Sequence, residues 1–221
     1  MSFSSGVKEE LYRHISPARH CQLAELAALL HFNGSIGVGT TGTFLQIHAE
    51  NALVVRKCFT LLQKIFNIEP EVSIRQHQKP QKTRIYNVLV PKHEDALRVL
   101  QALKLIDGHM EIRENLTAAD NILLQRTCCK RAFIRGAFLA SGSISDPEKG
   151  YHFEIVTVSE KRAQQLQQII RTCGIEAKTV VRKKYHVVYA KEGEQIGDLL
   201  SLMEAPKARM HTTINGIRIL A

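Results

Sequence analysis

Two stretches of nine residues decide the fold: Leu26-Ala-Ala-Leu-Leu-His-Phe-Asn-Gly34 and Ile134-Arg-Gly-Ala-Phe-Leu-Ala-Ser-Gly142. They start 108 positions apart, and the dipeptide Ser-Ile follows each of them. Both have the apolar spacing of a helix and end in glycine, a usual helix stop. Their small residues would let two helix backbones approach closely. We therefore predict two copies of one unit, with helix-packing residues that comprise Ala27, Ala28, Gly34, Gly136, Ala140 and Gly142.

The two stretches resemble the LAGLIDADG signature of homing endonucleases and their domesticated relatives. The resemblance implies two helices packed side by side at a pseudo-twofold axis, each delivering an acid before its final glycine to a divalent metal. Here those positions are Asn33 and Ser141, which supply neutral oxygens, whereas Mg²⁺ prefers anionic ones. The nearby acids Glu25, Asp146 and Glu148 lie back along the helix or in a predicted turn. We therefore predict a degenerate nuclease scaffold with no catalytic residues and no metal.

The same order of elements can be read twice along the chain. Hydrophobic periodicity predicts helix, hairpin, helix, two strands and helix in the first copy, at 19–33, 35–50, 52–66, 70–77, 83–90 and onward from Pro91. Thr117-Ala-Ala-Asp120 resembles a capping box and is predicted to start the second copy's first helix. The rest of that copy is predicted at 143–158, 160–172, 175–182, 185–190 and 193–203. Asn51 and Ser159 are the expected helix N-caps.

This repetition predicts an α+β fold of tandem αββαββα LAGLIDADG repeats. The two repeats should be related by a pseudo-twofold axis and form a saddle of two antiparallel sheets backed by helices. We divide the chain into residues 1–106, an N-terminal extension and the first repeat; 107–204, a connector and the second repeat; and 205–221, the start of a linker or an extra strand. A chain of 221 residues that is 44% apolar is long enough to bury a core.

Neither cofactor nor metal is predicted from the motifs. Gly37-Val-Gly-Thr-Thr-Gly42 matches the dinucleotide fingerprint, but a helix precedes it and an alternating strand follows, so these glycines are interpreted as hairpin residues. The five cysteines contain no Cys-x-x-Cys pair and the histidines have no recognised ligand spacing. We expect reduced, mostly buried thiols, and we find no evident reactive partner for Cys128 or Cys129.

Charge favours a nucleic-acid partner. The formal net charge is +9 and the pI is about 9.4, values typical of nucleic-acid binders. Two segments, 74–93 and 177–191, each hold five Lys or Arg residues and no acid. Lysine and arginine on a β-ribbon can contact phosphates or guanine edges in the major groove, although such charge also occurs on solvated strands. The DNA-binding candidates are Arg75, Lys79, Lys82, Arg84, Arg182, Lys183 and Lys184.

Longer blocks carry a closer resemblance. The opening Met1-Ser-Phe-Ser-Ser-Gly-Val-Lys-Glu-Glu-Leu11, the run from Cys21 to Ser35 and the run from Cys128 to Lys149 are similar to the bacterial WhiA family. That family implies a DNA-binding regulator of transcription, cell division, chromosome segregation and, in spore formers, sporulation. It also implies a silent N-terminal LAGLIDADG domain followed by a helix-turn-helix. Because no helix-turn-helix appears before Ala221, we expect the chain to be the N-terminal portion of a longer protein.

Three functions remain open at this point. The saddle binds double-stranded DNA itself, or it is a protein-interaction or dimerisation module while a separate helix-turn-helix binds DNA. A third and weaker hypothesis is a live nuclease with unconventional ligands. No run of about 18 apolar residues is present and the N-terminus lacks a signal-peptide layout. We therefore expect a cytoplasmic, nucleoid-associated protein without a membrane partner.

Overall fold

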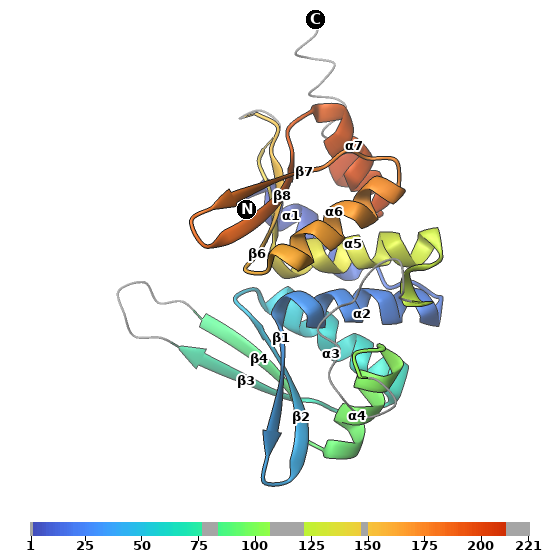
Figure 1. The fold of residues 1–221 in the computed structure, drawn as a ribbon, viewed down its shortest axis with the longest axis vertical. Helices are drawn as coiled ribbons and strands as arrows, with labels where there is room; N and C mark the ends of the chain where they lie inside the picture. The colour runs from blue at the N-terminus through green and yellow to red at the C-terminus, as the bar shows by residue number, and fades with distance from the viewer. Residues whose placement is uncertain (1, 77–83, 107–121, 147–149, 211–221) are drawn as a thin grey trace, which may run out of the picture.

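The computed structural model describes residues 2–76, 84–106, 122–146 and 150–210. Helix α1 (Phe3–Arg13) precedes two copies of one element order (Figure 1). The first copy contains α2 (Arg19–Asn33), β1 (Gly34–Gly39), β2 (Gly42–Ala49), α3 (Ala52–Phe66), β3 (Glu71–Gln76), β4 (Arg84–Val90) and α4 (His93–Ala102). The second contains α5 (Thr127–Ser141), β5 (Gly142–Ile144), β6 (Phe153–Thr157), α6 (Glu160–Thr172), β7 (Lys178–Arg182), β8 (Tyr185–Ala190) and α7 (Gly193–Leu202). The predicted αββαββα order is confirmed in both halves.

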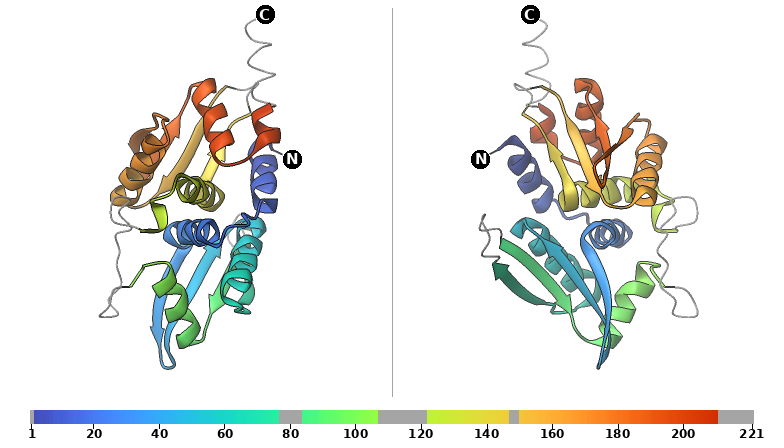
Figure 2. Two further views of the ribbon diagram at one scale, coloured as in Figure 1. Left: turned by 90° about the vertical axis from the view of Figure 1, so that its right-hand side faces the viewer. Right: turned by 60° about the vertical axis from the view of Figure 1, so that its left-hand side comes forward.

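Each copy forms a four-stranded antiparallel sheet, with strand orders β1-β2-β4-β3 and β5-β6-β8-β7. These two orders are equivalent, which confirms the predicted pseudo-twofold relation. Helices α2 and α5 lie side by side between the sheets, as the end-on view in Figure 2 shows. The other helices cover the same side of each sheet as this central pair. The protein is therefore the predicted saddle of two sheets backed by helices.

Local sequence signals account for the boundaries of several elements. The Asn51 side chain accepts a hydrogen bond from the Leu53 amide and caps α3, and Ser159 accepts one from the Arg162 amide and caps α6. Both N-caps were predicted. Strands β1 and β2 pair as a hairpin that brings Gly39 opposite Gly42. The glycine-rich segment is thus a hairpin turn and not a nucleotide-binding loop.

The core lies between each sheet and its helices. Leu45 and Ile47 of β2 pair with Val90 and Val88 of β4, and all four side chains are buried. In the second copy Phe153 stacks on Phe138 of α5, with ring centroids 5.2 Å apart. Alternate residues of β2, β4, β6 and β8 face this core because successive side chains point to opposite faces of a sheet.

Close packing of α2 on α5 depends on a residue without a side chain. A Cβ atom at Gly136 would lie 2.6 Å from the Glu25 carbonyl oxygen and 2.9 Å from the Ala28 Cβ. Ala27 and Ala28 are buried, whereas Ala140 is half-buried near the end of α5. These small residues therefore lie where the two backbones approach.

Gly34 and Gly142 serve a different local purpose. Each directly follows a motif helix and begins a strand, with φ of −90° and −83°. A Cβ at Gly34 would meet the Leu30 carbonyl oxygen, and one at Gly142 would meet the Phe138 ring. Their glycine identity lets the chain turn from helix to strand without an intervening loop.

Three boundary predictions are wrong. Helix α5 begins at Thr127, after a short 3-10 helix at Ile122–Leu124 and two bend residues, so the capping-box-like segment does not start it. That segment, 117–120, itself lies outside the described residues. Helix α4 begins at His93 rather than at Pro91. Residues 206–210 are helical and not an extra strand, and the amides of Lys207 and Ala208 donate to the Glu10 carboxylate.

Membrane-spanning helices were also sought. Within the part of the chain that the structure describes, no helix combines the length and apolarity needed to cross a bilayer.

The first prediction concerns the glycine between the motif helices. Gly136→Ala should destabilise the fold by about 1–3 kcal/mol, because the added methyl overpacks the helix contact, despite the better helix propensity of alanine. Gly197→Ala is the matched control: it lies inside α7 and its Cβ would meet no atom within 4 Å. The control should gain roughly 0.5–1 kcal/mol. Urea unfolding midpoints measure both; a Gly136→Ala protein as stable as the wild type would contradict the packing.

Candidate nucleic-acid interface

The face of each sheet opposite the helices is open, and the strand register identifies the residues on it. In the first sheet Leu45 and Ile47 point into the core, so Gln46 and His48 point the other way. Following the pairs across both sheets gives the open face. Its main polar and aromatic members are Gln46, His48, Glu71, Ser73, Arg75, Asn87, Glu154, Lys178, Arg182, Tyr185 and Tyr189.

The predicted basic residues of the first sheet do not form one patch. Arg75 pairs with Ile85 and shares the open face with Asn87 and Ser73. Arg84 pairs with Gln76. It is separated by an even number of residues from the core-facing Val88, so its side chain points to the helix side of the sheet and not to the open face. Both arginines are exposed. Lys79 and Lys82 lie outside the described residues.

In the second sheet one predicted arginine already has an acidic partner. Arg182 donates to Glu154 Oε2 at 2.9 Å, and that carboxylate also contacts His152 at 2.9 Å and Ser143 at 3.2 Å. Burial opposes ionisation of Glu154, but the hydrogen bonds from His152 and Ser143 and the charge of Arg182 outweigh it and lower the pKa. Arg182 is therefore held in place, and its charge is largely offset locally.

The neighbouring lysines are exposed. Lys183 and Lys184 form the turn between β7 and β8, and the Lys184 ammonium lies 5.5 Å from the centroid of the Tyr185 ring. The Lys191 ammonium lies equally close, at 5.5 Å, to the Tyr189 ring. Aromatic rings beside basic groups suit stacking and phosphate contact together.

Sequence reasoning missed part of this surface. Lys178, Tyr185 and Tyr189 lie on the open face with Arg182, but none was a candidate. The alternation of β7 and β8 would have identified them, because Lys178, Val180 and Arg182 are alternate residues and therefore point to the same face of the sheet. A count of charges along the segment does not distinguish the two faces.

The C-terminal ends of the motif helices meet, but the acids of a nuclease are not there. The Asn33 side-chain amide donates to the Ala140 carbonyl at 3.2 Å. The buried Ser141 hydroxyl has no hydrogen-bond partner within the described ranges. Of the alternative acids, Glu25 is fully buried elsewhere, Glu148 lies outside the described residues, and Asp146 belongs to no cluster of potential metal ligands in the described chain. The described donors therefore do not fit a two-carboxylate Mg²⁺ site.

A pocket of about 690 Å³ opens beside these helix ends. Lys8 of α1 and Asn33 line it together with residues 48–52. Burial lowers the pKa of Lys8, and its ammonium lies 5.9 Å from the Phe138 ring. Glu50 is the one carboxylate in the lining and is exposed. The pocket thus offers a cation, neutral hydrogen-bonding groups and a single carboxylate, but not the pair of carboxylates that a two-metal site needs.

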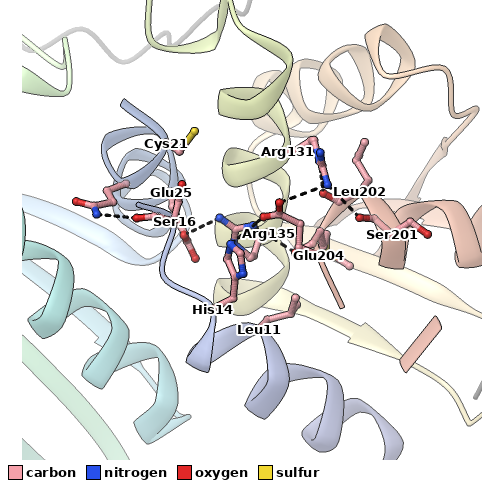
Figure 3. Close-up of polar contacts among 12 residues, drawn as sticks. Leu11, His14, Ser16, Cys21, Glu25, Arg131, Arg135, Ser201, Leu202 and Glu204 are labelled. Carbon is pink, nitrogen blue, oxygen red and sulfur yellow. Dashed lines mark hydrogen bonds and ion pairs between the residues drawn. The ribbon is translucent and has the colours of Figure 1, made fainter. Parts of the chain in front are cut away.

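Beneath the pocket region a buried ionic network joins the motif helices. Glu25 of α2 is fully buried, and its two carboxylate oxygens lie 3.0 Å from Lys57 Nζ and 3.1 Å from Arg135 Nη2. Figure 3 shows Glu25 and Arg135 pointing toward each other from α2 and α5. Burial lowers the pKa of Lys57 against the opposing effect of Glu25. Burial also disfavours the charge of Arg135, but Glu25 and Glu204 outweigh it and raise the pKa.

Both cations also bind helix C-termini. Lys57 Nζ donates to the carbonyls of Leu11, Tyr12 and His14 at the end of α1. Arg135 donates to the Met203 carbonyl at 3.3 Å, just after α7, and pairs with Glu204 at 2.5 Å (Figure 3). Unsatisfied carbonyls at a helix C-terminus carry partial negative charge. The network therefore fixes α1 and the end of α7 to the motif helices.

One expectation about the cysteines is wrong. His20, Cys21, Cys128 and Cys129 form a cluster at the N-terminal ends of α2 and α5, although no partner was evident for Cys128 or Cys129. The partners are about 108 residues away in sequence and become neighbours because the two helices pack side by side. Burial is the largest factor that raises the pKa of the Cys129 thiol to about 12.

Comparisons with known families match most of the chain. Residues 19–106 match the family model described as the WhiA N-terminal LAGLIDADG-like domain, and residues 130–220 match the WhiA LAGLIDADG-like domain. The second match includes the segment from 205 that the sequence analysis assigned to a linker. Both models therefore follow the repeat seen in the structure.

Curated relatives are named as probable cell division proteins WhiA. The protein from Lachnoclostridium phytofermentans is 48% identical and covers 100% of this chain, while the chain covers 70% of that relative. The protein from Desulforamulus reducens is 40% identical over 94% of this chain and 64% of the relative's length. The chain thus spans about two thirds of the length of these relatives.

Solved structures share the fold at low sequence identity. Full-length DUF199/WhiA from Thermatoga maritima has a TM-score of 0.70 at 18% identity, covering 96% of this chain and 66% of that one. The homing endonuclease I-DmoI, solved in complex with DNA and Mn, has a TM-score of 0.59 at 13% identity, covering 84% of this chain and 98% of that one. These likenesses establish the fold.

The buried carboxylate gives the second prediction. Glu25→Gln should destabilise the protein by about 3–5 kcal/mol, because it leaves Lys57 and Arg135 buried without their shared counter-charge. Asp95→Asn is the control, since it removes a carboxylate from the i,i+3 pair with the exposed Arg98 and should cost less than about 1 kcal/mol. Chemical unfolding of both variants tests the difference; equal, small losses would show that the network contributes no more than a surface pair.

Proposed function

Because the chain belongs to the WhiA family, whose curated relatives are named as probable cell division proteins, we propose that it is a non-catalytic, DNA-binding module of a regulator. Such a regulator acts at the nucleoid in transcription control, cell division and chromosome segregation, and in spore formers in sporulation. The observation that carries the proposal is the open face formed by the two sheets. The homing endonuclease I-DmoI, solved in complex with DNA, has the same fold.

The charge of the open face supports contact with a polyanion. Arg75, Lys178 and Arg182 lie on it, but Glu154 largely offsets Arg182, and Glu71 is a further acid on this face. Lys183 and Lys184 extend the second sheet, so the excess of positive charge lies at its tip. Basic groups that neutralise phosphates supply the sequence-independent part of DNA affinity. Among the polar side chains between them, the half-buried Gln46 has the donor and acceptor that base edges recognise.

The ends of the motif helices support binding without cleavage. Asn33 and Ser141 replace the expected acids, and Lys8 lies in the adjoining pocket. A nuclease of this fold places divalent metal beneath the scissile phosphates, whereas a lysine there would neutralise a phosphate directly and activate no water. Both the lost acids and the nearby cation therefore favour retention of DNA over hydrolysis.

A protein-interaction module is the second candidate function, and exposed apolar residues favour it. Val72 and Ile74 of β3 are 50% and 62% exposed, and Val181 of β7 is 63% exposed. They lie on the outer strands of the two sheets, whose unpaired backbone edges can bind a strand of a partner protein. In this alternative the DNA reader is the expected helix-turn-helix, which would belong to the third of the relatives' length that this chain does not match.

The third prediction separates these two functions. If the saddle binds duplex DNA, the logarithm of its affinity should fall linearly with the logarithm of salt concentration. The double variant Lys183→Ala/Lys184→Ala should reduce the magnitude of that slope by up to about 2, since each lost phosphate contact is worth about 0.9. Fluorescence anisotropy with a labelled duplex measures this effect.

The control removes the same charge from the helix side. Lys64 of α3 and Arg171 of α6 are exposed, so Lys64→Ala/Arg171→Ala should leave the slope unchanged. No binding of this chain at low salt would overturn the DNA-binding proposal and favour the protein-interaction alternative. An equal decrease of the salt slope in both double variants would indicate that DNA is attracted by the net charge of the protein rather than by the open face.

The fourth prediction concerns catalysis. Supercoiled plasmid incubated with the protein and Mg²⁺ or Mn²⁺ should show neither nicking nor linearisation, because the described helix ends provide no pair of carboxylates for the metals. Gel electrophoresis of the plasmid after prolonged incubation measures this. Metal-dependent cutting that co-purifies with the protein and is lost on mutation of Asp146 or Glu148 would establish the nuclease hypothesis instead.

A further inference from the structure

Four potential metal ligands meet where α2 and α5 begin. His20 and Cys21 lie in the first turn of α2, and Cys128 and Cys129 lie in the first turn of α5. The ligand atoms, one imidazole nitrogen and three sulfurs, all lie within 4.8 Å of one another. Cys21 and Cys129 are buried, His20 is half-buried and Cys128 is exposed, so the cluster lies at the surface end of the helix pair.

The spacing of these atoms suits one tetrahedral ion. His20 Nδ1 lies 3.3 Å from the Sγ atoms of both Cys21 and Cys129, and 4.0 Å from that of Cys128. Zinc with Zn–S bonds of about 2.3 Å and a Zn–N bond of about 2.0 Å has N···S tetrahedral edges of about 3.5 Å. The three N···S separations are therefore within about half an ångström of those in a zinc site. The sulfurs lie within 4.8 Å of one another, against S···S edges of about 3.8 Å, so metal binding would draw the thiolates together.

The repeat places these ligands at equivalent positions. His20 and Cys128 are 108 residues apart, as are Cys21 and Cys129, which is the same offset that relates the two nine-residue motifs. Each repeat thus contributes one adjacent pair of ligands from the same helical turn. A site shared in this way requires both repeats and lies at their pseudo-twofold interface.

We propose that His20, Cys21, Cys128 and Cys129 bind one Zn²⁺ in a closed, structural site that cross-links the two repeats. Three thiolates and an imidazole are the donors that zinc prefers, and four protein ligands leave no open position for a substrate or water. On binding, each of the three thiols releases a proton to solvent as three Zn–S bonds and one Zn–N bond form. No electron transfer is involved.

The helix ends and a nearby arginine favour the charge that this site would carry, whereas burial opposes ionisation of Cys21 and Cys129 by raising the pKa of both thiols. Three thiolates and Zn²⁺ together leave one net negative charge, and the N-terminal ends of two helices favour an anion. The exposed Arg126 guanidinium lies 3.3 Å from His20 Nε2. Coordination through Nδ1 places the imidazole proton on Nε2, so Arg126 must turn away from that nitrogen and is free to approach the thiolates.

Metal content of the reduced wild-type chain tests the proposal first. After dialysis against zinc and removal of excess metal, mass spectrometric metal analysis should find about one zinc per chain. Cobalt(II) in place of zinc should give thiolate-to-metal charge-transfer bands and the intense visible bands of a tetrahedral site. A chain with fully reduced thiols that takes up neither metal, or that forms only a disulfide among Cys21, Cys128 and Cys129, would overturn the proposal.

Matched cysteine variants localise the site. Cys21→Ser and Cys129→Ser should lose the zinc and the cobalt spectrum, whereas Cys173→Ser, at the C-cap of α6, should retain both. A chelator should lower the melting temperature of the wild type and of Cys173→Ser alike, and should have no effect on Cys21→Ser. If a ligand variant does not fold, the wild-type stoichiometry and cobalt spectrum still decide the question, because neither depends on that variant or on DNA binding.

Discussion

The close approach of α2 and α5 is the constraint on which the rest of the structure depends. Backbone meets backbone at Gly136, where a methyl group would collide with the Glu25 carbonyl. Strands β1 and β5 start immediately after these helices, at Gly34 and Gly142, with no connecting loop. The angle between the helices therefore sets the angle between the two sheets, and with it the shape of the open face. A change of helix spacing would be transmitted to both sheets at once.

The ionic network explains how the peripheral elements are held to this pair. One buried carboxylate, Glu25, faces two buried cations, and the excess positive charge is met by Glu204 and by carbonyls at the ends of α1 and α7. Such burial costs desolvation energy that the Coulomb attraction repays only with good geometry. The partners of the network lie at the ends of helices, so its hydrogen bonds form in only one arrangement of α1 and the second repeat around Glu25. A purely apolar contact would restrict that arrangement less.

Local signals predicted the elements, whereas contacts distant in sequence decided the site. The caps at Asn51 and Ser159 and the alternation of β2 are readable within a few residues, and the two motifs revealed the repeat. The opposite orientations of Arg75 and Arg84 depend on a strand register that charge counting cannot give. Helix α5 starts at Thr127 without a side-chain cap and packs against η1 (Ile122–Leu124) and α2, so no local capping pattern marks its start. The cysteine cluster required the equivalence of His20 with Cys128, although the 108-residue offset was visible in the sequence.

The packing of the motif helices does not require acids at their C-terminal ends. The requirement for small residues comes from the helix contact, where Ala28 and Gly136 satisfy it. This contact does not involve the side chains of Asn33 and Ser141 at the helix ends. Carboxylates at those ends would add repulsion between like charges unless a metal were bound. The Asn33 amide instead donates to the Ala140 carbonyl, a neutral contact between the helix ends that needs no bound cation. The same parallel pairing brings together the opposite ends of the helices, so the geometry that places Asn33 beside Ala140 at one end gathers one imidazole and three thiols at the other.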